Sequence, residues 1–181
     1  MSQRNTLVRS LHDVGLAAWF GGALMGAVGL NGGTAKAAEP SERLRLSSIG
    51  WGRWAPVQLT AIIAHGIGGV GLILGNKTRL VKQPEARANT ELKLGITAFA
   101  LIATGYSAIL GAKMAARAEE GGAGVTEPGA AASRKLASAQ RQQRVVQWLI
   151  PLATGALLIL GAQQGEQQRP VAGFLQSLLH R

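Results

Sequence analysis

The sequence predicts an all-α integral membrane protein: a four-transmembrane-helix bundle with helical extensions and a C-terminal amphipathic helix. Four uncharged, mostly apolar stretches of 19 to 23 residues carry this prediction, and all 19 basic and 9 acidic residues lie outside them. A helix rises about 1.5 Å per residue and the hydrocarbon core is about 30 Å thick, so each stretch is long enough to cross it. Lipid offers backbone groups no partner, and no segments alternate like barrel strands, so the spans are helices. We expect spans at 11–33, 55–75, 94–112 and 146–164.

The composition favours one membrane domain over a soluble or nucleic-acid-binding protein. The chain has 181 residues, and its spans leave only short connections, so residues 1–181 form a single domain. The net charge of +10 comes from Lys and Arg in those connections, where they favour anionic headgroups. The lipid bilayer is therefore an expected partner and nucleic acid is not. The absence of cysteine excludes disulfides and thiolate metal sites.

The first helix is expected to begin before the membrane, because Leu7, Val8 and Leu11 continue its apolar character. Its apolar run is long for the core of a cleaved signal peptide and contains Trp19, so we expect an uncleaved first span. The second span opens at 54–56, Trp-Ala-Pro, with the proline in the first turn, where its missing N–H costs little.

Spans two and three are predicted to form a helical hairpin that protrudes from the membrane. The second helix continues as a polar helix through Lys82, and Pro84 marks a tight reversal. Segment 85–93 then has the composition of a helix that leads into the third span.

The connection between spans three and four is the longest. Segment 120–129, Glu-Gly-Gly-Ala-Gly-Val-Thr-Glu-Pro-Gly, is a flexible hinge by composition, and 130–144 extends the fourth helix outward. Pro151 is expected to bend or loosen the first turns of that span. In the tail, 170–181, apolar residues recur at helical spacing and predict a short amphipathic helix on the membrane surface or on a partner. These residues are Val171, Phe174, Leu175, Leu178 and Leu179.

Four spans place both termini on one side of a bacterial inner (plasma) membrane. Lys and Arg are almost equally divided between the two sides, so their overall count does not fix the orientation. Arg4 and Arg9 beside the first span favour cytoplasmic termini. Trp51, Trp54 and Trp148 are then expected at the opposite interface.

His65 is the one ionisable side chain well inside a span, about 15 Å of helix from either end. Such residues are functional candidates because burying them is costly. Thr104, Tyr106 and Thr154 fall near the same depth, which predicts a mid-membrane polar cluster. The histidine is either neutral and satisfied by Tyr106 or Thr154, or it holds a ligand. His12 lies at the membrane edge, about 12 Å from that depth, so we expect no bis-histidine haem.

Small residues recur at four-residue spacing on the first two spans. They are Ala18, Gly22 and Gly26, and then Gly71 and Gly75. Such residues allow close approach of helices where lipid provides no hydrophobic drive for association. We expect them to pack helices within this bundle; packing against another protein is the alternative.

Segment 11–22, Leu-His-Asp-Val-Gly-Leu-Ala-Ala-Trp-Phe-Gly-Gly, resembles the opening of CopD-like and related uncharacterised bacterial four-helix membrane proteins. Those proteins often begin with a His, then a Trp and paired Gly on the first helix. The resemblance covers about a dozen residues. The copper association of CopD-like proteins is not carried over, because this chain has only three Met and three His.

No strong catalytic motif stands on this scaffold, so the protein is not expected to be an enzyme, and no cofactor or metal ligand is assigned. Apart from Asp13 at the membrane edge, no span offers an Asp or Glu to carry protons or coordinate a cation, which argues against an ion-coupled transporter. Our first hypothesis is a non-enzymatic accessory or scaffold subunit of a larger cell-envelope complex for transport or respiration, with other membrane subunits as partners. The alternative is a small-molecule or metal-handling membrane protein that uses His65. The third hypothesis is a single-His haem protein.

Overall fold

The structure is a computed structural model that describes residues 4–167. Its elements are α1 Arg4–Met25, η1 Gly26–Leu30, α2 Asn31–Thr34, α3 Pro40–Gly75, α4 Lys77–Lys82, α5 Pro84–Ala115, η2 Ala118–Glu120 and α6 Arg134–Gln167. Four helices are long and apolar enough to cross a membrane. The predicted all-α four-helix membrane fold is therefore confirmed. The predicted amphipathic tail lies outside the described residues.

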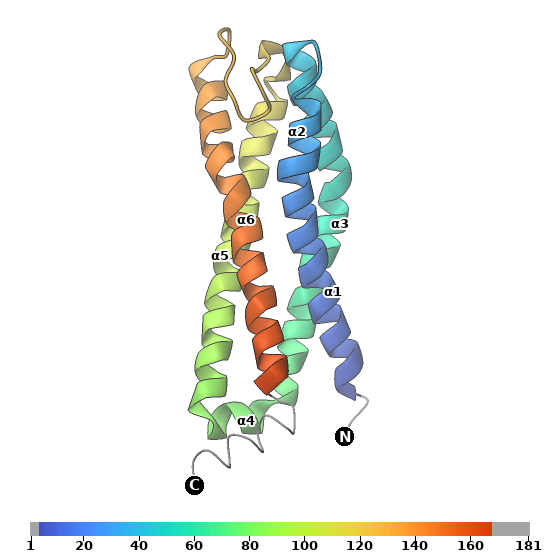
Figure 1. Cartoon of the computed structure of the whole chain (residues 1–181), viewed down its shortest axis with the longest axis vertical. Coiled ribbons are helices and arrows are strands. Elements are labelled where there is room, and N and C mark those ends of the chain that lie inside the picture. The colour runs from blue at the N-terminus through green and yellow to red at the C-terminus, as the bar shows by residue number, and fades with distance from the viewer. Residues whose placement is uncertain (1–3, 168–181) are drawn as a thin grey trace.

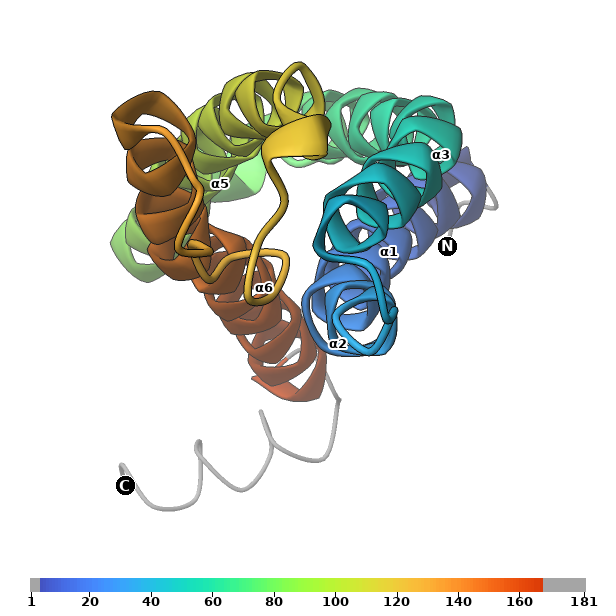
Figure 2. The ribbon, with the colours of Figure 1, turned by 90° about the horizontal axis from the view of Figure 1, so that it is seen from above.

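The long helices run alternately up and down (Figure 1). The helix formed by α1, η1 and α2 packs along α3, and α5 packs along α6 (Figure 2). Contact between α1 and α6 joins the two pairs, while α3 and α5 touch each other much less. One end of the bundle carries α4 and the start of α1, and we call it the α4 end. The opposite end carries the 116–133 connection, and we call it the loop end.

The second and third helices differ from the prediction at their boundaries. Pro56 lies inside α3 rather than in its first turn, because the helix already begins at Pro40. Residues 40–53 pack along η1 and α2, and these tertiary contacts carry the helix through the proline. At its other end α3 stops at Gly75, so α4 is a separate short helix. The predicted reversal is found at Pro84, which starts α5.

The glycine-rich connection is a folded loop, which corrects the expectation of a flexible hinge. Gln140, which is fully buried on α6, donates through Nε2 to the carbonyl oxygens of Gly124, Val125 and Glu127, at 3.0 to 3.3 Å. Val125 is itself buried in the hydrophobic cluster at the loop end. The glycines that loosen the unfolded chain also let this loop turn tightly, and Gln140 satisfies the carbonyls that the turn exposes.

Arg43 of α3 holds the same loop from the opposite side. Its Nη1 donates to the carbonyl oxygens of Gly122 and Ala123 at 3.1 and 2.9 Å, and its Nε donates to that of Ala37 at 2.8 Å. Gly121 adopts a φ of +70°, which only glycine reaches without strain. The loop therefore closes over the loop end of the bundle, as Figures 1 and 2 both show.

The acid stability of the loop end is expected to depend on Glu120. Its Oε2 accepts a hydrogen bond of 2.7 Å from the backbone N–H of Ser133, whose hydroxyl accepts from the N–H of Leu136 at the start of α6. The bonds to Ser133, with Arg117 nearby, hold the pKa of Glu120 below its ordinary value. A pKa that is lower in the folded state stabilises the fold above the unfolded value, and this stabilisation is lost as the pH falls through the folded value.

Glu120→Gln is therefore expected to remove part of the decrease in melting temperature between about pH 5 and pH 3. Glu119, an exposed neighbour, provides the matched control Glu119→Gln. Thermal unfolding in detergent at several pH values measures the effect. An acid dependence that is unchanged in Glu120→Gln contradicts the proposed role of this carboxylate.

The interior is built largely from small side chains, and large apolar side chains cover much of the outside. The cluster at mid-height contains Trp19, Ala23, Ala100, Ala103, Ile150 and Ala153. Outward-facing residues such as Ile67, Ile102 and Leu152 are 60 to 72% exposed. Such a surface is costly in water and is typical of helices that face lipid.

Candidate functional site

Two glycines bring the backbones of α1 and α3 together at the level of two histidines. A Cβ atom on Gly15 would lie 2.5 Å from the carbonyl oxygen of Ala61 and 2.6 Å from the nitrogen of His65. A Cβ atom on Gly68 would lie 2.7 Å from the Cα atom of His12. Neither position has room for a larger residue, so close approach of the two helices requires glycine at both.

This contact stacks the rings of His12 and His65. Their centroids lie 4.0 Å apart, with an angle of 23° between the planes. Each Nδ1 is bonded to the backbone carbonyl of the other residue, at 3.0 and 3.1 Å. Because a carbonyl oxygen only accepts, each Nδ1 must carry the hydrogen. In the neutral rings, each Nε2 is therefore left as a hydrogen-bond acceptor.

The predicted separation of His12 and His65 in depth is wrong. That estimate assumed that the uncharged stretches of the first two helices begin and end at the same depth. In the structure the two helices are shifted along their axes relative to each other. Gly22 lies against Trp54, and Gly26 lies against Trp51. Part of α1 thus pairs with the early part of α3, which the sequence had placed outside the membrane. As a result His65 faces the start of α1, towards the α4 end.

The predicted polar cluster around His65 is not formed. Thr104 accepts a bond of 3.2 Å from Nε1 of Trp19, and the hydroxyl of Tyr106 donates to Gln142. Thr154 is buried and donates to the carbonyl of Ile150 on its own helix, at 2.8 Å. None of the three bonds His65 directly, although Trp19, the partner of Thr104, has its ring edge-on to that of His65 with the centroids 6.1 Å apart. The hydrogen-bond partner of His65 is the backbone carbonyl of His12. Counting residues from the span ends could not show that these two residues meet.

Of the five small residues predicted to pack helices, three glycines lie at contacts with a neighbouring helix. At Gly22 an added Cβ would lie 2.5 Å from Cε2 of Trp54, and at Gly71 it would lie 2.6 Å from a methyl group of Val8. Both positions therefore bring α1 and α3 together, and Gly26 of η1 packs against Trp51 of α3 in the same way. Ala18 is half-buried, and Gly75 is exposed.

The tryptophans near the loop end differ in their surroundings. Trp51 and Trp54 are half-buried against α1, while Trp148 is 42% exposed. The first two therefore serve helix packing as well as any interfacial role.

A polar network that the sequence analysis missed lies nearer the loop end. Nδ2 of the buried Asn31 donates to Oε1 of Gln147 at 2.9 Å. Its Oδ1 accepts from the hydroxyl of Ser47 at 2.8 Å and from Nε1 of Trp51 at 3.0 Å. The π-helical turn η1 immediately precedes Asn31, and such turns shift the face that the following residues present. The sequence feature that could have indicated this network was Asn31 itself, a lone polar amide in an uncharged stretch.

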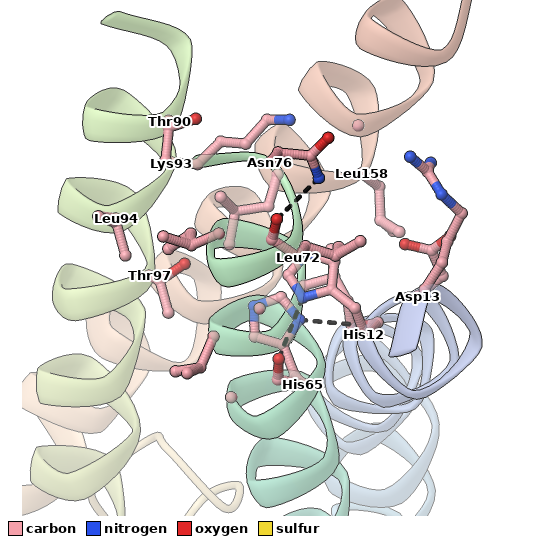
Figure 3. Close-up of a pocket in the computed structure, with 18 of the residues that line it drawn as sticks. His12, Asp13, His65, Leu72, Asn76, Thr90, Lys93, Leu94, Thr97 and Leu158 are labelled. Atoms are coloured by element: carbon pink, nitrogen blue, oxygen red, sulfur yellow. Dashed lines mark hydrogen bonds between the residues drawn. The ribbon is translucent and has the colours of Figure 1, made fainter. Parts of the chain in front are cut away.

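The histidine pair borders a cavity of about 810 Å³ at the α4 end. All four long helices contribute to its lining. Figure 3 shows Lys93, Thr90 and Asn76 near one end of the cavity, with the two histidine rings deeper between the helices. The polar and charged lining residues are Arg9, His12, Asp13, His65, Asn76, Arg79, Thr90, Lys93 and Thr97.

The cavity combines a basic mouth with apolar walls. Among the described residues that line it, Arg9, Arg79 and Lys93 are basic and Asp13 is acidic. The walls include Leu16, Val70, Ile73, Leu94, Leu157 and Leu158. Since α3 and α5 touch each other little, the helices on two sides of the cavity are not tightly joined. This arrangement suits a molecule with an apolar body and a polar, preferably anionic, group.

The stacked rings do not form a two-histidine metal site. Imidazole lone pairs lie in the ring planes, and two stacked rings with centroids 4.0 Å apart and planes inclined by 23° cannot both direct a lone pair at one ion. Axial haem ligation is excluded for the same pair, because it requires the rings on opposite sides of the iron. Within residues 4–167, no group of three His, Cys, Asp or Glu side chains could hold a metal ion.

Comparison with known proteins gives no assignment: no family model matches the chain, and no curated protein or solved structure does. The resemblance of 11–22 to CopD-like proteins therefore stays a hypothesis.

Proposed function

We propose that this protein is a non-enzymatic, multi-pass membrane protein that binds a small amphipathic molecule in the cavity at the α4 end. The observation that carries the proposal is the His12–His65 pair, which borders a cavity with a basic mouth and apolar walls. This develops the small-molecule alternative from the sequence. With cytoplasmic termini, as Arg4 and Arg9 favour, the cavity opens towards the cytoplasm.

The cost of the arrangement supports a role beyond packing. An ionisable residue within a span is costly to bury, and two histidines in contact there add to that cost. Two leucines at these positions would pack the helices without the cost of burying ionisable groups. Instead Gly15 and Gly68 bring the backbones into contact, and the two Nδ1 bonds fix which nitrogen of each ring remains an acceptor. Such fixed polar groups in an apolar pocket are what orient a ligand.

The lining defines the chemistry of the ligand. Three cations and one carboxylate at the mouth favour an anionic group, such as a carboxylate or phosphate. The apolar walls favour a hydrocarbon or ring body, and the two Nε2 atoms favour a hydrogen-bond donor on that body. A cavity of about 810 Å³ lies within the usual size range of small-molecule sites.

Titration with dodecanoate in lipid nanodiscs tests the proposal. Lys93→Gln removes a cation at the mouth and is expected to weaken binding about tenfold, equal to about 1.4 kcal/mol. His65→Phe keeps an aromatic ring but removes both nitrogens, and is expected to weaken binding of an analogue that carries a hydroxyl on its chain. Lys77→Gln, at an exposed position that does not line the cavity, is the control. Equal affinity in Lys93→Gln and Lys77→Gln contradicts the proposal.

The same preparation also tests the other two hypotheses. A membrane protein that co-purifies at a fixed ratio supports the accessory-subunit hypothesis. A visible absorption band supports the single-His haem hypothesis, in which the free Nε2 of one ring is the ligand. Mass spectrometry and an absorption spectrum of the native protein in mild detergent measure both.

A further inference from the structure

A second cavity lies at the loop end, on the face shared by α5 and α6. Its volume is about 370 Å³, and we call it the basic groove. It is lined by Leu110, Lys113, Arg117, Arg134, Lys135, Ser138, Ala139 and Gln142. Leu110 and Ala139 are buried and belong to the loop-end cluster. The groove is therefore supported by a packed core, and it lies at the opposite end of the bundle from the histidine pair.

The charge of the basic groove is unbalanced. Four of its eight lining residues are cations, and no lining residue is acidic. Of these four cations, Arg117 forms an ion pair with Glu120, with 3.8 Å between Nε and Oε1. Within residues 4–167, the other three, Lys113, Arg134 and Lys135, form no ion pair, and all three are exposed. Like charges gathered in this way repel one another, and an anion in the groove relieves that repulsion.

The depth of the groove identifies the source of the anion. The uncharged run of α5 ends at Ala112, so Lys113 is the first charge beyond the apolar part of that helix. On α6 the charges reach deeper, through Arg141 and Arg144, and the uncharged run begins at Val145. The headgroup region on this face therefore extends from the groove to Arg144. Beyond the last charge of each helix, α5 presents Ile109 and α6 presents Val145, which are 54% and 61% exposed. A lipid beside this face therefore has apolar contacts for its chains and cations for its headgroup. A free phosphate would use only the second of these.

We propose that the basic groove binds the phosphate headgroup of an anionic phospholipid whose chains lie along α5 and α6. Basic pockets between transmembrane helices at the headgroup level recognise such lipids by charge and by position together. Ser138 and Gln142 add hydrogen-bonding groups to the four cations. This site is independent of the cavity at the α4 end.

The test compares phospholipids that differ in charge. Purified protein in detergent is titrated with phosphatidylglycerol, cardiolipin or phosphatidylcholine, and bound lipid is measured by native mass spectrometry. We expect both anionic lipids to bind at least tenfold more tightly than phosphatidylcholine. In Lys113→Gln/Lys135→Gln this preference is expected to fall about 25-fold, because each of the two cations near a membrane surface contributes about a factor of five.

The matched control is Lys77→Gln/Lys82→Gln, which removes two exposed lysines at the α4 end. It is expected to retain the lipid preference. An equal loss in both double variants overturns the proposal, because the preference would then reflect overall charge. Displacement of phosphatidylglycerol by millimolar inorganic phosphate also overturns it, since the groove would then be a site for free phosphate. Melting temperatures in phosphatidylcholine nanodiscs confirm that both variants are folded.

Discussion

Replacing Gly68 by leucine is expected to lower the free energy of unfolding by about 3 kcal/mol, at the upper end of what overpacking costs. The Cβ atom alone would lie 2.7 Å from both Cα and Cβ of His12. Because the obstructing atoms include backbone, no rotamer change relieves the overlap, and α1 must move away from α3. The ring stack of His12 and His65 depends on that approach, so ligand binding in the neighbouring cavity is expected to be lost as well.

Gly66, two residues away on the same helix, provides the control for the effect on stability; it lines the cavity, so it is not a control for ligand binding. A Cβ atom there meets nothing within 4 Å, and the position is exposed. Gly66→Leu adds the same side chain and is expected to leave stability within about 0.5 kcal/mol. Unfolding in mixed micelles, followed by circular dichroism, measures both variants. If the two lose stability equally, α1 does not cross α3 at His12.

The spans were predictable because bilayer thickness fixes the length of an apolar helix. Charge-free stretches therefore located all four long helices. What they do not report is how far one helix is displaced along the next, since that depends on contacts between side chains. Here Gly15 and Gly68 set the displacement, and it brings His12 to His65. Counting from span ends placed the two residues about 12 Å apart.

The loop end shows a second limit of composition. A run of glycines predicts a flexible loop only if no other group forms hydrogen bonds with its backbone. In this chain a single buried amide, that of Gln140, bonds three of the loop carbonyls, and Arg43 bonds others from α3. Both residues are distant from the loop's centre in sequence. Gln140 looked like an ordinary polar position on the helical extension at 130–144, and Arg43 lay in a segment for which no helix was predicted. Tertiary partners of this kind have no local signal.

Asn31→Leu is expected to destabilise the protein by about 2–3 kcal/mol, the second large effect. Leucine has the same branching at Cγ and the same number of heavy atoms as asparagine, so the substitution keeps the outline of the side chain and removes its hydrogen bonds. Three bonds disappear, and the buried groups of Gln147 and Ser47 and the indole N–H of Trp51 are left without that partner. An interhelical hydrogen bond in a membrane protein contributes about 0.6 kcal/mol on average, and leaving a buried group unsatisfied adds to this.

A double-mutant cycle separates this network from a general effect of polarity. Gln147→Leu alone leaves Nδ2 of Asn31 without its partner, whereas Asn31→Leu/Gln147→Leu removes both ends of that bond. The double variant is therefore expected to lose less stability than the two single losses combined, by about 0.6 kcal/mol or more. Gln163→Leu, at an exposed position on α6, should be neutral. Strict additivity in the cycle would mean that Asn31 of α2 and Gln147 of α6 do not bond.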